Sequence, residues 1–481
     1  MKPKKILTAA LLSLALGAGA NANELMAPSI GTAGSLAITV PKEKQYGEFF
    51  MRTVRSQSGV INDPVLNEYL NFIGNRLVSN ASNVQFPFEF FLVNDSALNA
   101  AAFLGGKIQV NTGLFNYSDS EDQFASVLAH EVVHVTQRHI ARIVEAQAGR
   151  TSVTLAGAIG SIAMAIINPM VGMAALSTTV GLAAQTNINF TRENEYEADR
   201  LSIAIMHRAG FNPEGTVEMF KKLYSMQGNI NPAQALLSTH PLSEQRIAEA
   251  QSRILSYPKR RSSANPNFQL AKARVAVRFG DKSRMADFKE GLVKNYQKHN
   301  ETYRNYALAL LALDKDDTAE ARSYLSRLGP ELQGNIFVVD VKTDIDITDK
   351  NYSAAIGRLV PMYKRMPRNH AVVINLANTY IQAGQYGKAR EVLDAYMKKT
   401  SRQYLALTLM AEALEKLNNR CEALQVQGEI LEMAGNYNRA IGRFNQALQT
   451  CEGYLDKERI KARVVQATEQ RSFDESLKKT R

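Results

Sequence analysis

Two histidines that frame a glutamate have the spacing of a hydrolytic metal site. The segment is His130-Glu131-Val132-Val133-His134, with the histidines four positions apart. Residues four apart share one face of an α-helix, so both imidazoles can bind one ion. Glu131 then lies beside the ion, where it can take a proton from a water molecule that the metal binds. We therefore predict His130 and His134 as metal ligands and Glu131 as the proton acceptor.

The segment that carries this motif has a helical pattern. Residues 118–121 resemble a capping box, and an apolar face follows, made of Phe124, Val127, Leu128 and Val135. On a continuous helix, His139 points about 140° away from His134. This favours a position on the surface or beside a metal ligand for His139.

A catalytic zinc ion usually takes three protein ligands and keeps one position open, so two histidines leave one ligand missing. Residues 192–200 open a further predicted helix, on which Glu195 and Asp199 share a face. We predict that Glu195 binds the metal and that Asp199 supports catalysis by accepting an imidazole N–H, which orients a histidine ligand. The alternative is a solvated acidic helix start, for which Glu193 and Glu197 are the better candidates.

Composition narrows the class of protein. The 481 residues are 45% hydrophobic and 21% charged, which is typical of globular proteins and excludes disordered, collagenous and polytopic membrane chains. The net charge of +11 favours an anionic lipid, lipopolysaccharide or an acidic protein as partner. We predict no nucleic-acid partner, because the N-terminus resembles an export signal.

The N-terminus has the three parts of a signal peptide. Three lysines within residues 1–5 precede an apolar run at 7–16, and Ala20-Asn21-Ala22 gives the small-x-small cleavage pattern. The apolar run is shorter than the ~20 residues that span a bilayer. We predict a signal peptide at 1–22, cleaved near Ala22, and export. In an exported chain, Cys421 and Cys451 can form a disulfide if the fold brings them together.

Small residues recur at a fixed period in the C-terminal half. The alanines at 321, 355, 389 and 423 are each 34 positions apart, as in tetratricopeptide repeats. The spacing of Gly384, Tyr386 and Ala389 recurs as Gly435, Tyr437 and Ala440, but half a period out of phase, which predicts an irregular last unit. Such a solenoid offers a concave surface to proteins or peptides.

The polar, basic segment 258–266 ends in a proline and is typical of a linker. We predict a mainly α (α+β) chain, with a metallopeptidase domain at 23–257 that holds a small β-sheet and an α-solenoid at 267–481. Residues 151–185 carry no charge, and Asn168-Pro169 divides them. We predict that this segment forms an apolar helical hairpin beside the active site and that the hairpin touches the membrane. It would not cross the membrane, because each half is too short to span ~30 Å of hydrocarbon.

Several motifs occur in one order along the chain. They are Asn99, Gly105-Gly106, residues 111–114 (NTGL), the HEVVH motif, Glu195 with Asp199, Thr239-His240-Pro241 with Arg246, and the repeats. Together they resemble the family of β-barrel assembly-enhancing proteases, gluzincin-type zinc peptidases of the Gram-negative periplasm that are related to the CAAX prenyl protease. The resemblance implies a zincin-type fold with one zinc ion per chain. It also implies misassembled outer-membrane proteins as substrates, and the outer-membrane β-barrel assembly machinery as a partner of the repeats.

In that family, the residue that corresponds to His240 reaches the zinc as an extra ligand and keeps the enzyme latent. Neutral imidazole is a common zinc ligand, so this role is chemically consistent. His240 could instead hydrogen-bond the transition state or be an ordinary loop residue. Arg246 either stabilises the oxyanion or pairs with an acid such as Asp199.

The resemblance also places the strand at 107–111 beside the active cleft. An extended substrate can hydrogen-bond the edge of such a strand with little sequence preference, unless that edge is covered. Asn99 either contacts the substrate backbone or forms a turn. Unfolded polypeptides are therefore the expected substrates.

We predict a zinc endopeptidase of the periplasm that degrades misassembled outer-membrane proteins and assists their assembly. The alternative is a periplasmic repeat chaperone with a latent or structural zinc site. A third possibility is an integral-membrane protease that uses the 151–185 hairpin.

Overall fold

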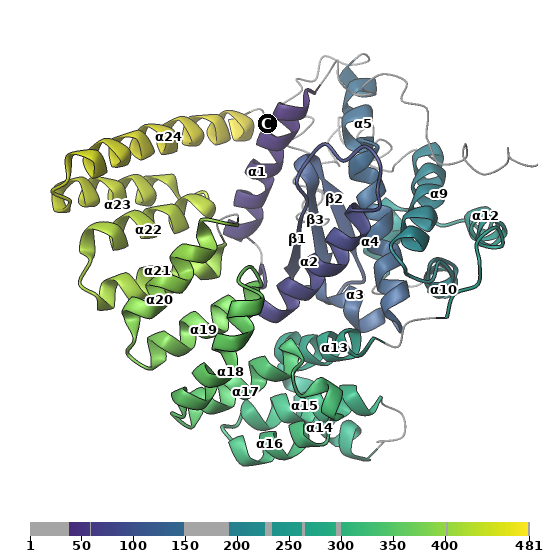
Figure 1. Cartoon of the computed structure of the whole chain (residues 1–481). Coiled ribbons are helices and arrows are strands. Elements are labelled where there is room, and N and C mark those ends of the chain that lie inside the picture. Colours follow the sequence, from purple (N-terminus) through teal and green to yellow (C-terminus); the bar gives the residue numbers. More distant parts are fainter. Residues whose placement is uncertain are drawn as a thin grey trace, which may run out of the picture.

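Helices form most of the structure, and one three-stranded sheet lies among them (Figure 1). The computed structural model describes residues 38–57, 59–148, 192–226, 233–261, 265–294, 300–400 and 403–479. The predicted mainly α fold with a small sheet is confirmed. The predicted signal peptide at 1–22 and the predicted hairpin at 151–185 lie outside the described residues. Among the helices of the described part, none is long and apolar enough to cross a membrane.

The sheet has the order β1-β3-β2. β3 (Lys107–Asn111) pairs in parallel with β1 (Glu89–Val93) and antiparallel with β2 (Ala100–Phe103). Residues 107–111 are therefore the middle strand, and the prediction that they offer an edge to substrate is wrong. The reason is the turn Leu104–Gly106, whose two glycines adopt φ angles of 70° and 81° and fold β2 back along β3. The edge strand on this side is β2.

α4 (Glu121–Thr136) carries both histidines of the metal motif and is buried along its whole length. Ser120 caps this helix by accepting a hydrogen bond from the N–H of Gln123, whose side chain accepts one from the N–H of Asp119. The capping contacts therefore involve Ser120 and Gln123 and differ from those predicted for 118–121. α4 packs against β2, α2 (Pro64–Val78), α9 (Arg192–Arg208) and α10 (Glu214–Ser225).

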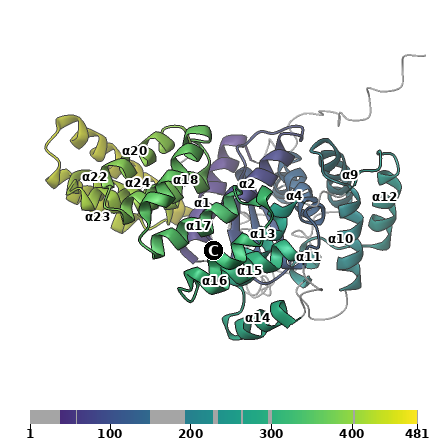
Figure 2. The same ribbon diagram turned by 60° about the horizontal axis from the view of Figure 1, so that its bottom comes forward.

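Pairs of helices form the C-terminal half (Figures 1 and 2). They are α15 (Glu301–Leu313) with α16 (Thr318–Ser326), α17 (Ile336–Thr348) with α18 (Tyr352–Arg365), α19 (His370–Gln382) with α20 (Tyr386–Met397), and α21 (Tyr404–Lys416) with α22 (Arg420–Met433). Before them, α13 (Pro266–Phe279) and α14 (Met285–Lys294) both pack against α15. The periodic alanines 321, 355, 389 and 423 are all buried, one in each of α16, α18, α20 and α22. Small side chains there allow close helix packing, and the predicted repeats are confirmed.

The repeats change phase at their C-terminal end. Gly384, with φ of 72°, lies in the turn between α19 and α20, whereas Gly435, with φ of 68°, lies between α22 and α23 (Tyr437–Thr450). α22 is therefore the second helix of one pair and the first helix of the next. α24 (Tyr454–Lys479) follows α23 and packs against it. A disulfide between Cys421 and Cys451 joins α22 to the end of α23.

The repeats share a hydrophobic core with the N-terminal region. The ring of Phe268 on α13 lies 6.3 Å from that of Phe115 and 6.0 Å from that of Phe124. One buried apolar cluster contains residues from Ile61 to Ala371 and so extends across the segment 258–266. The segment predicted as a linker therefore connects two regions that are packed together.

A second contact lies at the opposite end of the repeats. α24 returns to α1 (Val40–Gln57), where the C-terminal end of the chain appears in Figure 1. Arg52 donates two hydrogen bonds to Asp474, at 2.9 and 2.7 Å, and the hydroxyl of Tyr437 donates a third at 2.7 Å. Leu477 joins the apolar cluster beneath α1. The repeat region is thus held against the N-terminal region at both ends.

A buried cation contributes to the first of these contacts. The guanidinium of Arg274 on α13 donates to Asp63 at 2.6 Å and to Asp340 at 2.6 Å. Asp63 also caps α2 through the N–H of Leu66, and Asp340 accepts a bond from Asn375 on α19. Burial opposes the charge of Arg274, but the carboxylates raise its pKa well above the usual value. One ionic network therefore joins α2, α13, α17 and α19.

We predict that Arg274→Ala lowers the free energy of unfolding by about 3–5 kcal/mol, because it leaves two buried carboxylates without their cation. The control is Arg459→Ala, which removes an exposed pair with Asp456 within α24 and costs about 0–1 kcal/mol. Circular dichroism in guanidinium chloride measures both, since the chain has no tryptophan for fluorescence. Equal losses in the two variants would contradict this account of the interface.

Candidate metal centre

α4 brings its two histidines together at one point. The Nε2 atoms of His130 and His134 lie 2.9 Å apart, and both side chains are buried. The first turn of α9 adds Glu195, which is 2% exposed. Its Oε1 lies 3.5 Å from Nε2 of His134, and its Oε2 lies 3.5 Å from Nε2 of His130. The structure therefore brings the three predicted ligands into one cluster.

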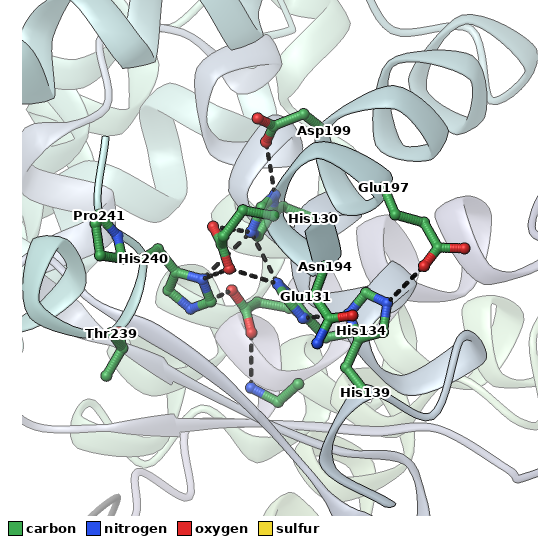
Figure 3. A network of polar contacts seen from close by, with 12 residues as sticks. His130, Glu131, His134, His139, Asn194, Glu197, Asp199, Thr239, His240 and Pro241 are labelled. Atoms are coloured by element: carbon green, nitrogen blue, oxygen red, sulfur yellow. Dashed lines mark hydrogen bonds and ion pairs between the residues drawn. The ribbon is translucent and has the colours of Figure 1, made fainter. Parts of the chain in front are cut away.

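His240 adds a fourth donor atom. It follows α11 (Gln234–Thr239), and its Nδ1 lies 3.0 Å from Oε1 of Glu195 and 3.3 Å from Nε2 of His130. The donor atoms of all four residues lie within 4.8 Å of one another. The three histidines of this cluster are labelled in Figure 3. Tetrahedral zinc with bonds of about 2.1 Å requires ligand atoms about 3.4 Å apart. Three imidazoles and one carboxylate at these separations fit a zinc ion.

A buried carboxylate and a buried guanidinium orient the side chains of His130 and Glu195. Asp199 lies one helical turn after Glu195, with Oδ1 3.1 Å from Nδ1 of His130. Arg246 of α12 (Glu244–Ile254) donates to both oxygens of Asp199, at 2.7 and 2.8 Å, and its Nη1 lies 2.8 Å from Oε2 of Glu195. Of the two alternatives for Arg246, the described structure contains the pairing with Asp199.

These contacts set the charges of the cluster. Burial disfavours charge on Glu195, yet the imidazoles of His240 and His130 hold its pKa well below the usual range. Burial likewise opposes the protonation of His130, but Asp199 and Glu195 raise its pKa to about 10. The pKa of His134 is lowered well below its usual value, first by burial and then by His130.

His139 is buried beside this cluster of predicted metal ligands. Its Nδ1 lies 2.7 Å from Nδ1 of His134, and its Nε2 lies 3.2 Å from Oε2 of Glu197 (Figure 3). Glu197 also accepts a bond of 2.7 Å from Arg142. The surface alternative for His139 is therefore wrong. The angle expected from a continuous helix does not apply, because α4 ends at Thr136 and the chain turns before α5 (His139–Ala148).

Arg138 forms this turn. It has a φ of 52°, which redirects the chain between the two helices. Its guanidinium is buried, where it donates to Glu43 at 2.6 Å and to the carbonyl of Ile38 at 2.7 Å. An arginine whose backbone adopts the left-handed conformation leaves no signal in the sequence pattern. The position of His139 could therefore not be inferred from spacing alone.

Glu131 is held by the edge of the sheet. Its Oε2 accepts a hydrogen bond of 2.7 Å from the N–H of Ala102 on β2, and its Oε1 lies 3.5 Å from Nε2 of His240. Burial raises the pKa of the Glu131 carboxyl. A carboxylate with a raised pKa, placed beside a metal cluster, is suited to accept a proton and release it again. The backbone contact of Ala102 was not predicted, because almost any residue type can supply a main-chain N–H.

Asn99 joins the sheet through its main chain. Its carbonyl accepts a hydrogen bond of 3.0 Å from the N–H of Asn111, which extends the β2–β3 ladder. The Oδ1 atom of Asn99 is buried without a hydrogen-bond partner among the described residues. The structure therefore places Asn99 directly before β2, and its role in substrate binding stays a prediction.

Comparison with known proteins supports this chemistry. Residues 64–254 match Peptidase family M48, and residues 347–413 match a tetratricopeptide repeat. The chain is 36% identical over 443 residues to the β-barrel assembly-enhancing protease of Escherichia coli K12, covering 91% of this chain and 90% of the relative. It is 35% identical over 447 residues to the putative β-barrel assembly-enhancing protease of Vibrio cholerae, covering 92% of each.

A more distant relative shares only part of the chain. Mitochondrial metalloendopeptidase OMA1 of Schizosaccharomyces pombe is 28% identical over 180 residues, which is 37% of this chain and 50% of the relative. All four residues of the metal cluster lie within the segment that matches Peptidase family M48. The predictions of a metallopeptidase and of zinc as its metal are confirmed. The chain therefore belongs to the β-barrel assembly-enhancing protease family, with an M48 metallopeptidase domain followed by tetratricopeptide repeats.

Proposed function

We propose that this protein is a periplasmic zinc endopeptidase that degrades misassembled outer-membrane β-barrel proteins and assists their assembly. The observation that carries the proposal is the buried cluster of His130, His134 and Glu195, with Glu131 directly beside it. The names of the relatives connect such a protein to β-barrel assembly.

In this proposal, His130, His134 and Glu195 hold one zinc ion, which polarises the scissile carbonyl when it is bound. Glu131 accepts the proton of the attacking water and later donates it to the leaving amine. The N–H of Ala102 holds one oxygen of Glu131, so that the other oxygen faces the cluster. Asp199 and Arg246 position His130 and Glu195 and do not contact the substrate.

His240 is proposed to restrain activity as a fourth ligand. Its Nδ1 occupies a corner of the cluster that a water molecule and a substrate need. Hydrolysis therefore requires the segment after α11 to withdraw. The competing role, a hydrogen bond from His240 to the transition state, also agrees with its position near Glu131, and a variant of His240 separates the two.

The repeats are protein-binding modules, and we propose that they dock the enzyme onto the outer-membrane β-barrel assembly machinery. Export through the signal peptide at 1–22 is part of the proposal. A disulfide between Cys421 and Cys451 supports it, because such bonds persist in oxidising compartments. The second candidate function, a repeat chaperone with a latent zinc site, is favoured by the four-ligand arrangement at the metal cluster.

We predict that Glu131→Gln lowers the rate of cleavage of an unfolded β-barrel protein by about 10²–10⁴-fold, because the proton acceptor is lost. Zinc content and client binding should remain, since neither uses the charge of Glu131. The control is Glu193→Gln, which removes an exposed carboxylate from α9. Gel-based cleavage assays and metal analysis measure the two effects. Full activity in Glu131→Gln protein would reject the proposed mechanism.

A second prediction concerns His240→Ala. Removal of the fourth ligand should raise the cleavage rate by about tenfold or more, while one zinc ion per chain remains bound by the other three residues. Ser238→Ala, an exposed change on the same segment, serves as the control and should leave the rate unchanged. A fall in the rate would instead assign His240 to turnover.

A third prediction tests the residues that orient the ligands. His139→Ala and Asp199→Asn each remove a partner of a ligand imidazole, so each should weaken zinc binding by about 10–100-fold. His207→Ala on α9 is the control, because His207 contacts Tyr257 outside the cluster. Competition with a fluorescent chelator measures the affinities. Unchanged zinc affinity in His139→Ala would show that the contact with His134 does not support the metal.

A further inference from the structure

A pocket with a largely apolar lining opens beside Glu131. It lies between α4, α9, α10 and the segment that runs from α11 to α12, and its apolar residues are Val127, Met219, Phe220, Leu223, Leu236 and Leu242. His130, Glu131 and His240 border the same pocket. The pocket is therefore continuous with the metal cluster, and a peptide held there would extend a side chain into it.

The polar residues in the lining have partners within the protein. The hydroxyl of Ser126 donates to the carbonyl of Gln123, and that of Ser202 donates to the carbonyl of Asp199. The hydroxyl of Thr216 is directed at the sulfur of Met206, 3.3 Å away.

The lining also contains Arg246, which likewise has partners within the protein. Its guanidinium contacts Asp199, Glu195 and the carbonyl of Pro241. A charged side chain in this pocket would lose water without gaining a partner, whereas an apolar side chain would gain contacts.

We propose that this pocket binds an apolar side chain of the client, from a residue that flanks the cleaved bond. The inference rests on the proposed peptidase function and adds a substrate preference to it. Val127 lies one helical turn before His130, on the face of α4 that carries the metal motif, so an occupant of the pocket lies next to the reacting bond. The free energy of selection comes from burial of apolar surface. The enzyme thereby favours apolar segments that a membrane-inserted β-barrel keeps within the lipid bilayer.

The test measures binding without turnover. The full-length protein with His240→Ala and Glu131→Gln, loaded with zinc, is titrated with labelled peptides that differ only in one central residue, Leu, Phe or Asp. Fluorescence anisotropy should show the Leu peptide binding about tenfold or more tightly than the Asp peptide. Because the peptides are otherwise identical, a difference in affinity comes from the central residue alone. Equal affinities for Leu and Asp peptides would overturn the inference.

A lining variant then locates the preference. Leu223→Ala enlarges the pocket and should shift preference several-fold from Leu toward Phe, whereas the volume-conserving control Leu223→Met should leave it unchanged. Thermal melts confirm that both variants fold. A preference for apolar peptides that Leu223→Ala does not alter would place the selection elsewhere and reject this pocket.

A cleavage assay separates this inference from the proposed function. His240→Ala protein with Glu131 intact is given the same peptides, and the products are identified by mass spectrometry. Selective binding of Leu peptides without any cleavage would reject the peptidase and leave the pocket assignment standing. Cleavage with no apolar preference beside the broken bond would support the peptidase and reject the pocket assignment.

Discussion

The structure depends on one constraint, the convergence of three helical segments on a buried set of metal ligands. α4, α9 and the end of α11 place three imidazoles and a carboxylate within 4.8 Å of one another. Such a cluster is unfavourable unless its charges are compensated. Asp199 and Arg246 supply that compensation on one side, and His139 with Glu197 supplies it on the other. The buried polar contacts around the cluster follow from this requirement.

The position of the repeats also follows from a physical requirement, the covering of exposed surface. A row of helix pairs needs its terminal surfaces covered. Here α13 enters the core of the peptidase region, and α24 returns to α1 through Asp474 and Arg52. The repeats are therefore packed against the enzyme at both ends. A protein held by them would lie close to the peptidase domain.

Much of this was predictable from the sequence, because its strongest signals are periodic. The HExxH spacing and the pair Glu195 and Asp199 depend only on the geometry of a helix, and the 34-residue alanine period depends on close helix packing. What escaped prediction is set by tertiary contacts. The hydrogen bond from Ala102 to Glu131 uses the main chain, and the turn at Arg138 brings His139 back to His134. The edge strand was assigned to 107–111 because a hairpin of β2 and β3 leaves little trace in residue types.

X-ray absorption spectroscopy at the zinc edge, on the wild-type protein loaded with one zinc ion per chain, tests the central claim most directly. The account predicts a four-coordinate ion with three imidazoles and one carboxylate, and a change to two imidazoles in His240→Ala protein. Two imidazoles in the wild-type protein, with a spectrum that His240→Ala leaves unchanged, would contradict the account. His240 would then lie near the metal without binding it.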